Sequence, residues 1–275
     1  MARIYCPKGN PSECMATIYD YGDGLVEGSW YPYPESKNRY PEEKAERGES
    51  ENREENELFA IRRAKTKARR LILTIRPTSL GTTTFRENVT DPERAWKVQE
   101  RFQRLVHEKF PSDKFIVFPE LQKRGAFHFH FPIAGWMPKQ KLHYYHKCWK
   151  RAAGKLGGTF NVSWHRMAGV SDKDNTVKIC NYLLKYLVKQ LGNAVRELGG
   201  HRYRASKEIK LNRTRYLIDA QTIMEAASEL VALIAHHGGV ARYYFQSDGN
   251  DNAPIYGWAC SWGGGKRDNN GFVPP

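Results

Sequence analysis

The stretch FIVFPELQKRGAFHFHFPIAGW, residues 115–136, constrains the fold more than any other part of the chain. Its two halves carry the apolar and aromatic residues of β-strands, and the segment QKRG between them ends in Gly125, which suits a hairpin turn. Side chains two residues apart in a strand share a face, so His128 and His130 project together while the alternating phenylalanines face the other side. The stretch therefore predicts an antiparallel hairpin whose oily face must be covered.

Helix and strand patterns flank this hairpin on both sides. They predict helices at about 42–68, from Asp91 and Pro92, from Pro138, over 175–193 and after Asp219, and further strands at 69–77, 160–167 and 201–211. Residues 1–40 are rich in Tyr, Pro and Gly and are expected to be irregular, and the last residues to form a mobile terminus. The fold class is therefore α+β, with a central antiparallel sheet and flanking helices.

The net charge of the chain favours a polyanionic partner. Lys and Arg number 44 against 30 Asp and Glu, which gives a formal charge of +14. An acidic run at 42–57 precedes a basic run at 61–70, a pattern typical either of a solvated helix or of a helix that lies along a phosphate backbone. The candidate DNA contacts are Arg62, Arg63, Lys65, Lys67, Arg69, Arg70, Lys123, Arg124, Arg202 and Arg204.

The sequence also indicates a cellular compartment. No apolar run approaches the length needed to span a membrane, and the N-terminal residues lack the apolar segment of a signal peptide. The five cysteines form no CxxC pair, which favours reduced thiols. We therefore expect a cytoplasmic protein without a membrane partner, located in the host cytoplasm if the gene is viral.

Two imidazoles on one strand face form a convergent pair of nitrogen ligands for a metal ion. Glu120 lies on the preceding strand, and antiparallel pairing brings cross-strand neighbours within about 5 Å, so its carboxylate can join His128 and His130. A His-His-Glu site with open positions suits Mn²⁺ or Mg²⁺ holding a phosphate, while zinc stays open. Surface histidines, and a Glu120 paired with Arg124, are the simpler alternatives, and the neutral Gln122 is a weaker substitute for Glu120.

Tyr182 and Tyr186 are four residues apart on a predicted helix and so share one face. Tyrosine at this spacing is more often amphipathic packing than catalysis. The alternative is a pair of nucleophiles that attack a phosphodiester, which would need a divalent cation and a nearby positive charge because a phenol with a pKa near 10 attacks poorly at neutral pH. The histidine pair can supply the cation site, and Lys185 the charge.

PELQKRGAFHFHF followed by YLLKYLVK is similar to the HUH endonucleases, and in particular to the two-tyrosine rolling-circle replication initiators of small single-stranded DNA phages and plasmids. LILTIRP sits where that superfamily has its first motif. The resemblance implies an RRM-like core over 69–237, between an N-terminal extension, 1–68, and a partly flexible C-terminal extension, 238–275. It also implies functional roles for six residues, with metal ligands at His128, His130 and Glu120, nucleophiles at Tyr182 and Tyr186, and an electrostatic helper at Lys185.

The resemblance further implies a site-specific endonuclease and strand transferase that nicks and religates single-stranded origin DNA through a 5′-phosphotyrosine. A host polymerase would extend the freed 3′ end, and a host helicase would unwind, because the sequence contains no GxxxxGK[ST] motif. Three alternatives stay open: a non-catalytic single-strand binding module, a related transposase or relaxase, and a zinc hydrolase, although HExxH is missing. The oligomeric state is not indicated.

Overall fold

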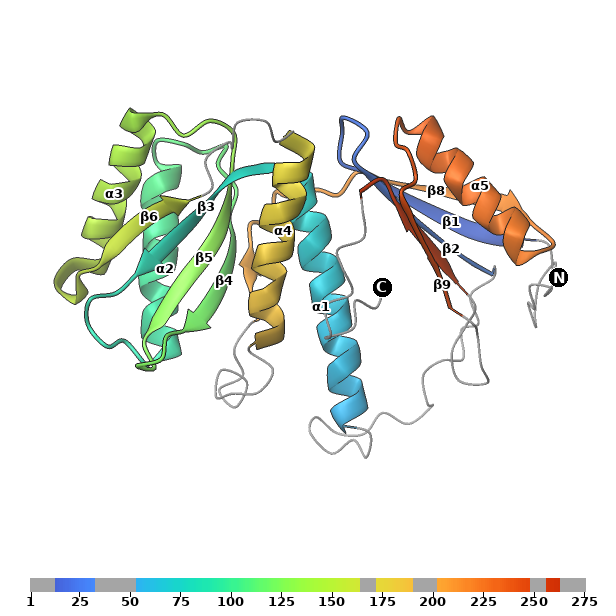
Figure 1. Cartoon of the computed structure of the whole chain (residues 1–275). Helices are drawn as coiled ribbons and strands as arrows, with labels where there is room; N and C mark the ends of the chain where they lie inside the picture. The colour runs from blue at the N-terminus through green and yellow to red at the C-terminus, as the bar shows by residue number, and fades with distance from the viewer. Residues whose placement is uncertain (1–12, 33–52, 164–171, 190–201, 248–255, 263–275) are drawn as a thin grey trace. The chain divides into compact units, whose positions relative to one another are not determined.

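The computed structural model describes residues 13–32, 53–163, 172–189, 202–247 and 256–262 (Figure 1). The chain divides into two compact units, one formed by residues 1–62 and 211–275 and the other by residues 63–210. Each unit is built on its own antiparallel sheet of five strands. The α+β class, with helices packed on a central antiparallel sheet, is therefore confirmed.

The sheet of the 63–210 unit contains the expected hairpin at its centre. Its strand order is β6-β3-β5-β4-β7, and the strands are β3 (Pro77–Thr84), β4 (Ile116–Leu121), β5 (Phe127–Ala134), β6 (Thr159–Ser163) and β7 (Arg204–Ala205). Gly125, at the turn between β4 and β5, has a φ of 82°, a left-handed conformation that glycine adopts at little cost.

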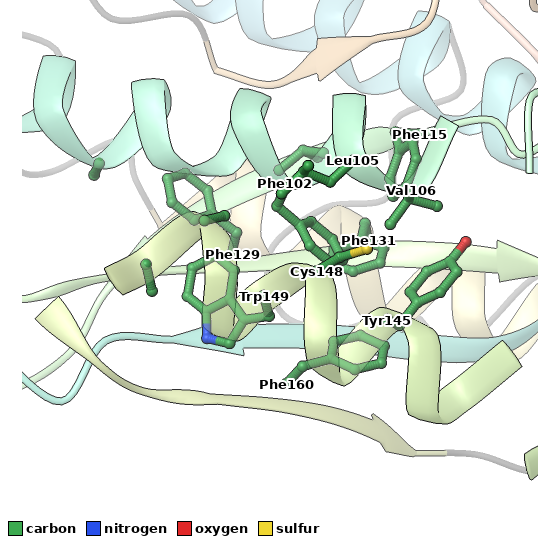
Figure 2. Packing of buried hydrophobic residues seen from close by; sticks show 14 of the residues in the cluster. Phe102, Leu105, Val106, Phe115, Phe129, Phe131, Tyr145, Cys148, Trp149 and Phe160 are labelled. Atoms are coloured by element: carbon green, nitrogen blue, oxygen red, sulfur yellow. The ribbon is translucent and has the colours of Figure 1, made fainter. Parts of the chain in front are cut away.

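One face of this sheet is buried under α2 (Pro92–His107) and α3 (Lys139–Ala153), which is followed by a short 3₁₀ turn, η1 (Gly154–Leu156). Asp91 caps α2 by accepting a hydrogen bond from the Glu93 amide at 2.9 Å, and Pro92 occupies the first turn, as the sequence predicts. Figure 2 shows the aromatic core between these layers, including Phe102, Phe129, Phe131, Tyr145, Trp149 and Phe160. The phenylalanine side of β5 is therefore the core side.

The opposite face of the sheet meets α4 (Asp172–Lys189), as Figure 1 shows. At its N-terminal end, the side chain of Asn175 donates to the carbonyl of Thr78 at 3.0 Å, and the hydroxyl of Thr176 donates to the carbonyl of Pro77 at 3.2 Å. These bonds tie the start of α4 to the start of β3. The helix expected over 175–193 is present, and its residues beyond Lys189 lie outside the described part.

The strand expected at 69–77 is wrong, because these residues continue helix α1 (Arg53–Ile75). Ala68, Leu71 and Ile72 are buried at helical spacing, so the branched residues serve one helix face rather than a strand. The helix ends at Arg76, whose φ is 50°, and β3 starts at the proline that follows. Residues 42–52 of the expected charged helix lie outside the described residues.

The expectation of irregular structure for residues 1–40 is wrong for Glu13–Pro32, which form strands β1 (Glu13–Asp20) and β2 (Val26–Pro32). They belong to the second sheet, of order β8-β1-β2-β10-β9, with β8 (Arg213–Asp219), β9 (Tyr243–Gln246) and β10 (Gly257–Cys260). Cys14, Ala16 and Ile18 alternate into a core beneath α5 (Ile223–His236). Their main partner, β8, lies far away in the sequence, and the local composition gives no sign of it.

Three further expectations need adjustment. Helix α5 is capped by Thr222 in a capping box with Glu225 rather than by Asp219, which is the last residue of β8. The strand expected at 201–211 is reduced to the two residues of β7, and the strand expected at 160–167 is described only as far as Ser163. The two-unit division also differs from boundaries at 68 and 237, because α5 packs on the second sheet and not on the first.

Candidate functional site

Glu120, His128 and His130 come together on the face of the 63–210 sheet that is turned away from the aromatic core. Glu120 on β4 lies opposite His128 on β5 in the antiparallel register. A carboxylate oxygen of Glu120 lies 2.6 Å from Nε2 of His128 and 3.0 Å from Nε2 of His130, and the two Nε2 atoms are 3.1 Å apart. The three ligand atoms all lie within 4.8 Å of one another, so they can bind one metal ion.

The charge state of Glu120 suits this role. Burial raises the pKa of the Glu120 carboxyl, but hydrogen bonds from His128 and His130 outweigh burial and hold the pKa well below its ordinary value. The carboxylate is therefore ionised at neutral pH and balances the charge of a bound cation. The side chains retain 21%, 16% and 7% of their exposure at Glu120, His128 and His130, so the site is open on one side.

Two further side chains contact the outer nitrogens of the imidazoles. The hydroxyl of Thr82 on β3 lies 3.1 Å from Nδ1 of His130, and the amide nitrogen of Gln122 lies 3.4 Å from Nδ1 of His128. Such contacts orient ring nitrogens toward a metal. Two nitrogens and one carboxylate fit a divalent cation that keeps open coordination positions for a substrate.

Sequence reasoning misses Thr82 and considers Gln122 only as a substitute ligand. Thr82 escapes it because the first strand of the sheet is expected at 69–77, a few residues before the position that β3 occupies. The threonine run at 82–84 is the signal that could have found it.

Tyr182 and Tyr186 on α4 face this centre. The ring of Tyr186 stacks on His130, with centroids 4.2 Å apart and planes 14° from parallel. Its hydroxyl donates a 2.6 Å hydrogen bond to the hydroxyl of Tyr182, whose ring centroid lies 6.4 Å from that of His130. The helical face that carries both phenols is thus directed at the metal centre.

The two phenols differ in their surroundings. Tyr186 is 6% exposed and Tyr182 is half-buried. Burial, and then the hydrogen bond to Tyr182, raise the pKa of Tyr186. Both sequence interpretations therefore hold for Tyr186, which packs against β5 and also lies beside the candidate metal ligands.

Lys185 is not brought into this cluster. Its side chain is exposed, and within the described part of the chain it forms no hydrogen bond with the three candidate ligands or the two tyrosines. A cavity of about 340 Å³ elsewhere in the unit, lined in part by Asp113, Phe115 and Tyr145, contains none of the candidate site residues.

The predicted DNA contacts fall into different environments. The residues with exposed side chains are Arg62, Arg63, Lys67 and Lys123, and those half-buried are Lys65, Arg70 and Arg202. Arg69 is buried, with 5% exposure, and is not presented to solvent as a phosphate contact requires.

Two of the predicted DNA contacts hold the fold together instead. Arg124 donates to the carbonyls of Phe85 and Arg86 at 2.6 and 2.8 Å, and to the side chain of Gln122 at 3.0 Å. It therefore braces the β4–β5 turn and does not pair with Glu120, the alternative that the sequence left open. Arg204 pairs with Glu100 and lies 4.3 Å above the ring of Trp96.

Fold and site together define an α+β domain with a His-His-Glu metal centre that faces a pair of helical tyrosines. Residues 78–191, which run from β3 beyond α4 and include all five of these side chains, match the family model of the replication-associated proteins ORF2 and gene 2 protein. The chain thus carries a domain of this family of rolling-circle replication-associated proteins. The chain matched no curated protein and no solved structure. Within the described residues no helix is long and apolar enough to cross a membrane.

Proposed function

We propose that the protein is a rolling-circle replication initiator that cuts and rejoins single-stranded origin DNA through a covalent 5′-phosphotyrosine. The observation that carries this proposal is the stacking of Tyr186 on His130, which puts two phenols beside a candidate metal centre. A non-catalytic binding module would have no need of three converging metal ligands opposite a tyrosine pair.

In the proposed reaction a phenolic oxygen attacks the phosphorus of the scissile phosphodiester. A bond forms between that oxygen and phosphorus, the bond from phosphorus to the 3′ oxygen breaks, the phenol loses its proton and the leaving 3′ oxygen gains one. A divalent ion, Mn²⁺ or Mg²⁺, would polarise the phosphate from the position that Glu120, His128 and His130 surround. Because the covalent bond conserves the phosphodiester energy, rejoining needs no ATP.

The two tyrosines divide the cycle between them. One phenol holds the 5′ end while a host polymerase extends the free 3′ end, and the other cuts the regenerated origin. The new 3′ hydroxyl then attacks the first phosphotyrosine and closes a circle. Unwinding falls to a host helicase, because the sequence contains no phosphate-binding GxxxxGK[ST] motif. The setting for these steps is the cytoplasm of the host cell.

We assign the endonuclease to the 63–210 unit, since the metal ligands and both tyrosines lie within it. The DNA backbone is held by exposed cations, of which Arg62, Arg63, Lys67 and Lys123 have the most accessible side chains. Lys185 is exposed beside the tyrosines and serves to steady negative charge on the bound strand. Contacts of this kind produce an affinity that falls steeply with salt.

The test is formation of a protein–DNA adduct that resists denaturation. The full chain is incubated with Mn²⁺ or Mg²⁺ and single-stranded oligonucleotides tiled across its own replicon, and products are separated under denaturing conditions. We expect an adduct with one oligonucleotide, no adduct after EDTA treatment, and none with the Tyr182→Phe/Tyr186→Phe or His128→Ala/His130→Ala variants.

The matched control is Tyr144→Phe, which removes a phenol of the same unit that donates to the carbonyl of Leu105. It is expected to form the adduct normally. An adduct that persists in the double tyrosine variant, or binding of every oligonucleotide without any adduct, would show that the protein is not this enzyme. The second outcome is what a single-strand binding module predicts.

A further inference from the structure

The sheet face that carries the metal centre continues past it onto β3 and β6. In the antiparallel register His130 lies opposite Thr82, and Thr82 lies opposite Asn161. The 3.1 Å contact between the Thr82 hydroxyl and Nδ1 of His130 confirms that these side chains project to the same side. Asn161 is exposed on β6, which is an edge strand of this sheet.

A second row runs beside the first. His128 lies opposite Thr84, and Thr84 lies opposite Thr159, while Ser163 continues the same face of β6 in the other direction. Thr159 and Ser163 are exposed, and Thr84 is half-buried. We call this surface the polar strip, and its members are Thr82, Thr84, Thr159, Asn161 and Ser163.

The polar strip has a chemistry of its own. Every member offers hydrogen-bond donors and acceptors, and none carries a charge. Phosphate groups are bound mainly by cations, whereas the edges of bases are read by neutral hydroxyl and amide side chains as well. An uncharged surface of this kind therefore fits the bases of a nucleic acid strand better than its backbone.

The strip is also contiguous with the reaction centre. Two strand spacings separate β5 from β6, so Asn161 lies about 10 Å from His130 across the sheet. Phe160 points into the aromatic core on the other side, which fixes the outward direction of its neighbours Thr159 and Asn161. A DNA strand whose phosphate rests at the metal centre can therefore lay its adjoining bases on the strip.

We propose that the polar strip reads the bases next to the scissile phosphate and so contributes to the choice of origin sequence. This inference rests on the proposed function, because it takes single-stranded DNA as the ligand. In a single strand the edges of the bases are free, so hydroxyl and amide side chains can discriminate between them without first opening a duplex.

The experiment reads binding and needs no cleavage. A library of single-stranded oligonucleotides with a randomised segment is selected on the full chain carrying Tyr182→Phe and Tyr186→Phe, with Mn²⁺ present, and the bound fraction is sequenced. The same selection is repeated after adding Asn161→Ala and Thr159→Val. The matched control adds Gln140→Ala, which removes an exposed amide from α3, the helix on the core side of the sheet.

The parent and the Gln140→Ala chain are expected to enrich the same bases. The strip variant is expected to lose about tenfold in preference at each base that it contacts, while its affinity for non-enriched strands and its dependence on salt stay unchanged. Milder Asn161→Ser and Ser163→Ala variants, checked by urea unfolding, separate this loss from misfolding.

Three results would overturn the inference. They are an unchanged base preference in the strip variants, a uniform loss of affinity with a smaller salt slope, and the absence of any base preference in the parent. None depends on the covalent reaction, so a protein that reads bases but forms no adduct would contradict the proposed function alone.

Discussion

The ring of Tyr186 stacks on the imidazole of His130, with ring centroids 4.2 Å apart. This contact fastens α4 to β5, so it has a structural effect separate from any chemistry of the phenol. We expect Tyr186→Ala to lower the free energy of unfolding by about 3 kcal/mol, as for other buried aromatic rings. Tyr186→Phe keeps the ring and is expected to cost about 1 kcal/mol or less, since the half-buried Tyr182 can bond to water instead.

Urea unfolding of the two variants measures this difference. Tyr182→Ala, which removes a ring that is less buried, is the comparison and should be destabilised less than Tyr186→Ala. Equal stability of Tyr186→Ala and the parent would mean that the ring does not pack on β5.

Metal binding should stabilise the folded chain through Glu120, His128 and His130. A ligand present at 100 times its dissociation constant adds about 2.7 kcal/mol to the free energy of unfolding, and Mn²⁺ should therefore raise the melting temperature in a concentration-dependent way. EDTA should reverse the effect. Glu120→Gln keeps the shape but loses the charge, so the Mn²⁺-dependent rise should shrink, and an unchanged rise would remove Glu120 from the ligand set.

Thr82 is expected to orient His130 through its hydroxyl, which lies 3.1 Å from Nδ1. Loss of such an outer contact typically costs about 10- to 100-fold in metal affinity, so Thr82→Val should weaken Mn²⁺ binding by that factor, while Thr82→Ser should restore it. Isothermal titration measures the affinity directly. Thr84→Val is the control, because Thr84 forms no hydrogen bond with either imidazole among the described residues.

Arg124 and Lys123 are adjacent bases with different predicted effects. Arg124 donates to two backbone carbonyls and to Gln122, so Arg124→Ala should lower the free energy of unfolding by about 1 kcal/mol or more. Lys123 is exposed, and Lys123→Ala should leave stability unchanged but reduce the salt slope of DNA binding by about one phosphate contact. Unfolding curves and binding at several salt concentrations distinguish the two, and the reverse assignment would contradict this prediction.

Tyr145 should make the fold sensitive to alkali. Burial, and then the hydrogen bond that its hydroxyl donates to Asp113 at 2.5 Å, raise the pKa of Tyr145 above the ordinary value of 10.0. A raised pKa contributes stability that is complete below pH 10 and is lost as the pH rises further, because the unfolded chain releases the proton first. Urea midpoints from pH 8 to 11.5 should fall more steeply for the parent than for Tyr145→Phe, and parallel curves would exclude this cause.

The hairpin at the centre of the site could be predicted because its information is local. Alternation of phenylalanine and histidine fixes which side chains share a face, and Gly125 permits the turn, so the convergence of Glu120 with His128 and His130 followed from strand geometry alone. The phase of α4 is equally local, and it brought Tyr182 and Tyr186 onto one helical face.

Other features depend on partners that are distant in the sequence. The branched residues at 71–75 suit a strand or a buried helix face equally well, and packing of Ala68, Leu71 and Ile72 selected the helix. The strands at 13–32 needed β8 and α5 to bury Cys14, Ala16 and Ile18, which no local pattern announces.

The sequence by itself determined the elements of the site, because periodicity and turn chemistry act between neighbours along the chain. Only the tertiary structure decided that the tyrosine face of α4 rests on His130, that Thr82 approaches the same ring from β3, and that Arg124 braces a turn instead of facing solvent. The physical reason is that a helix or strand specifies which side chains point together, whereas the surface they meet depends on how the buried faces of distant segments pack.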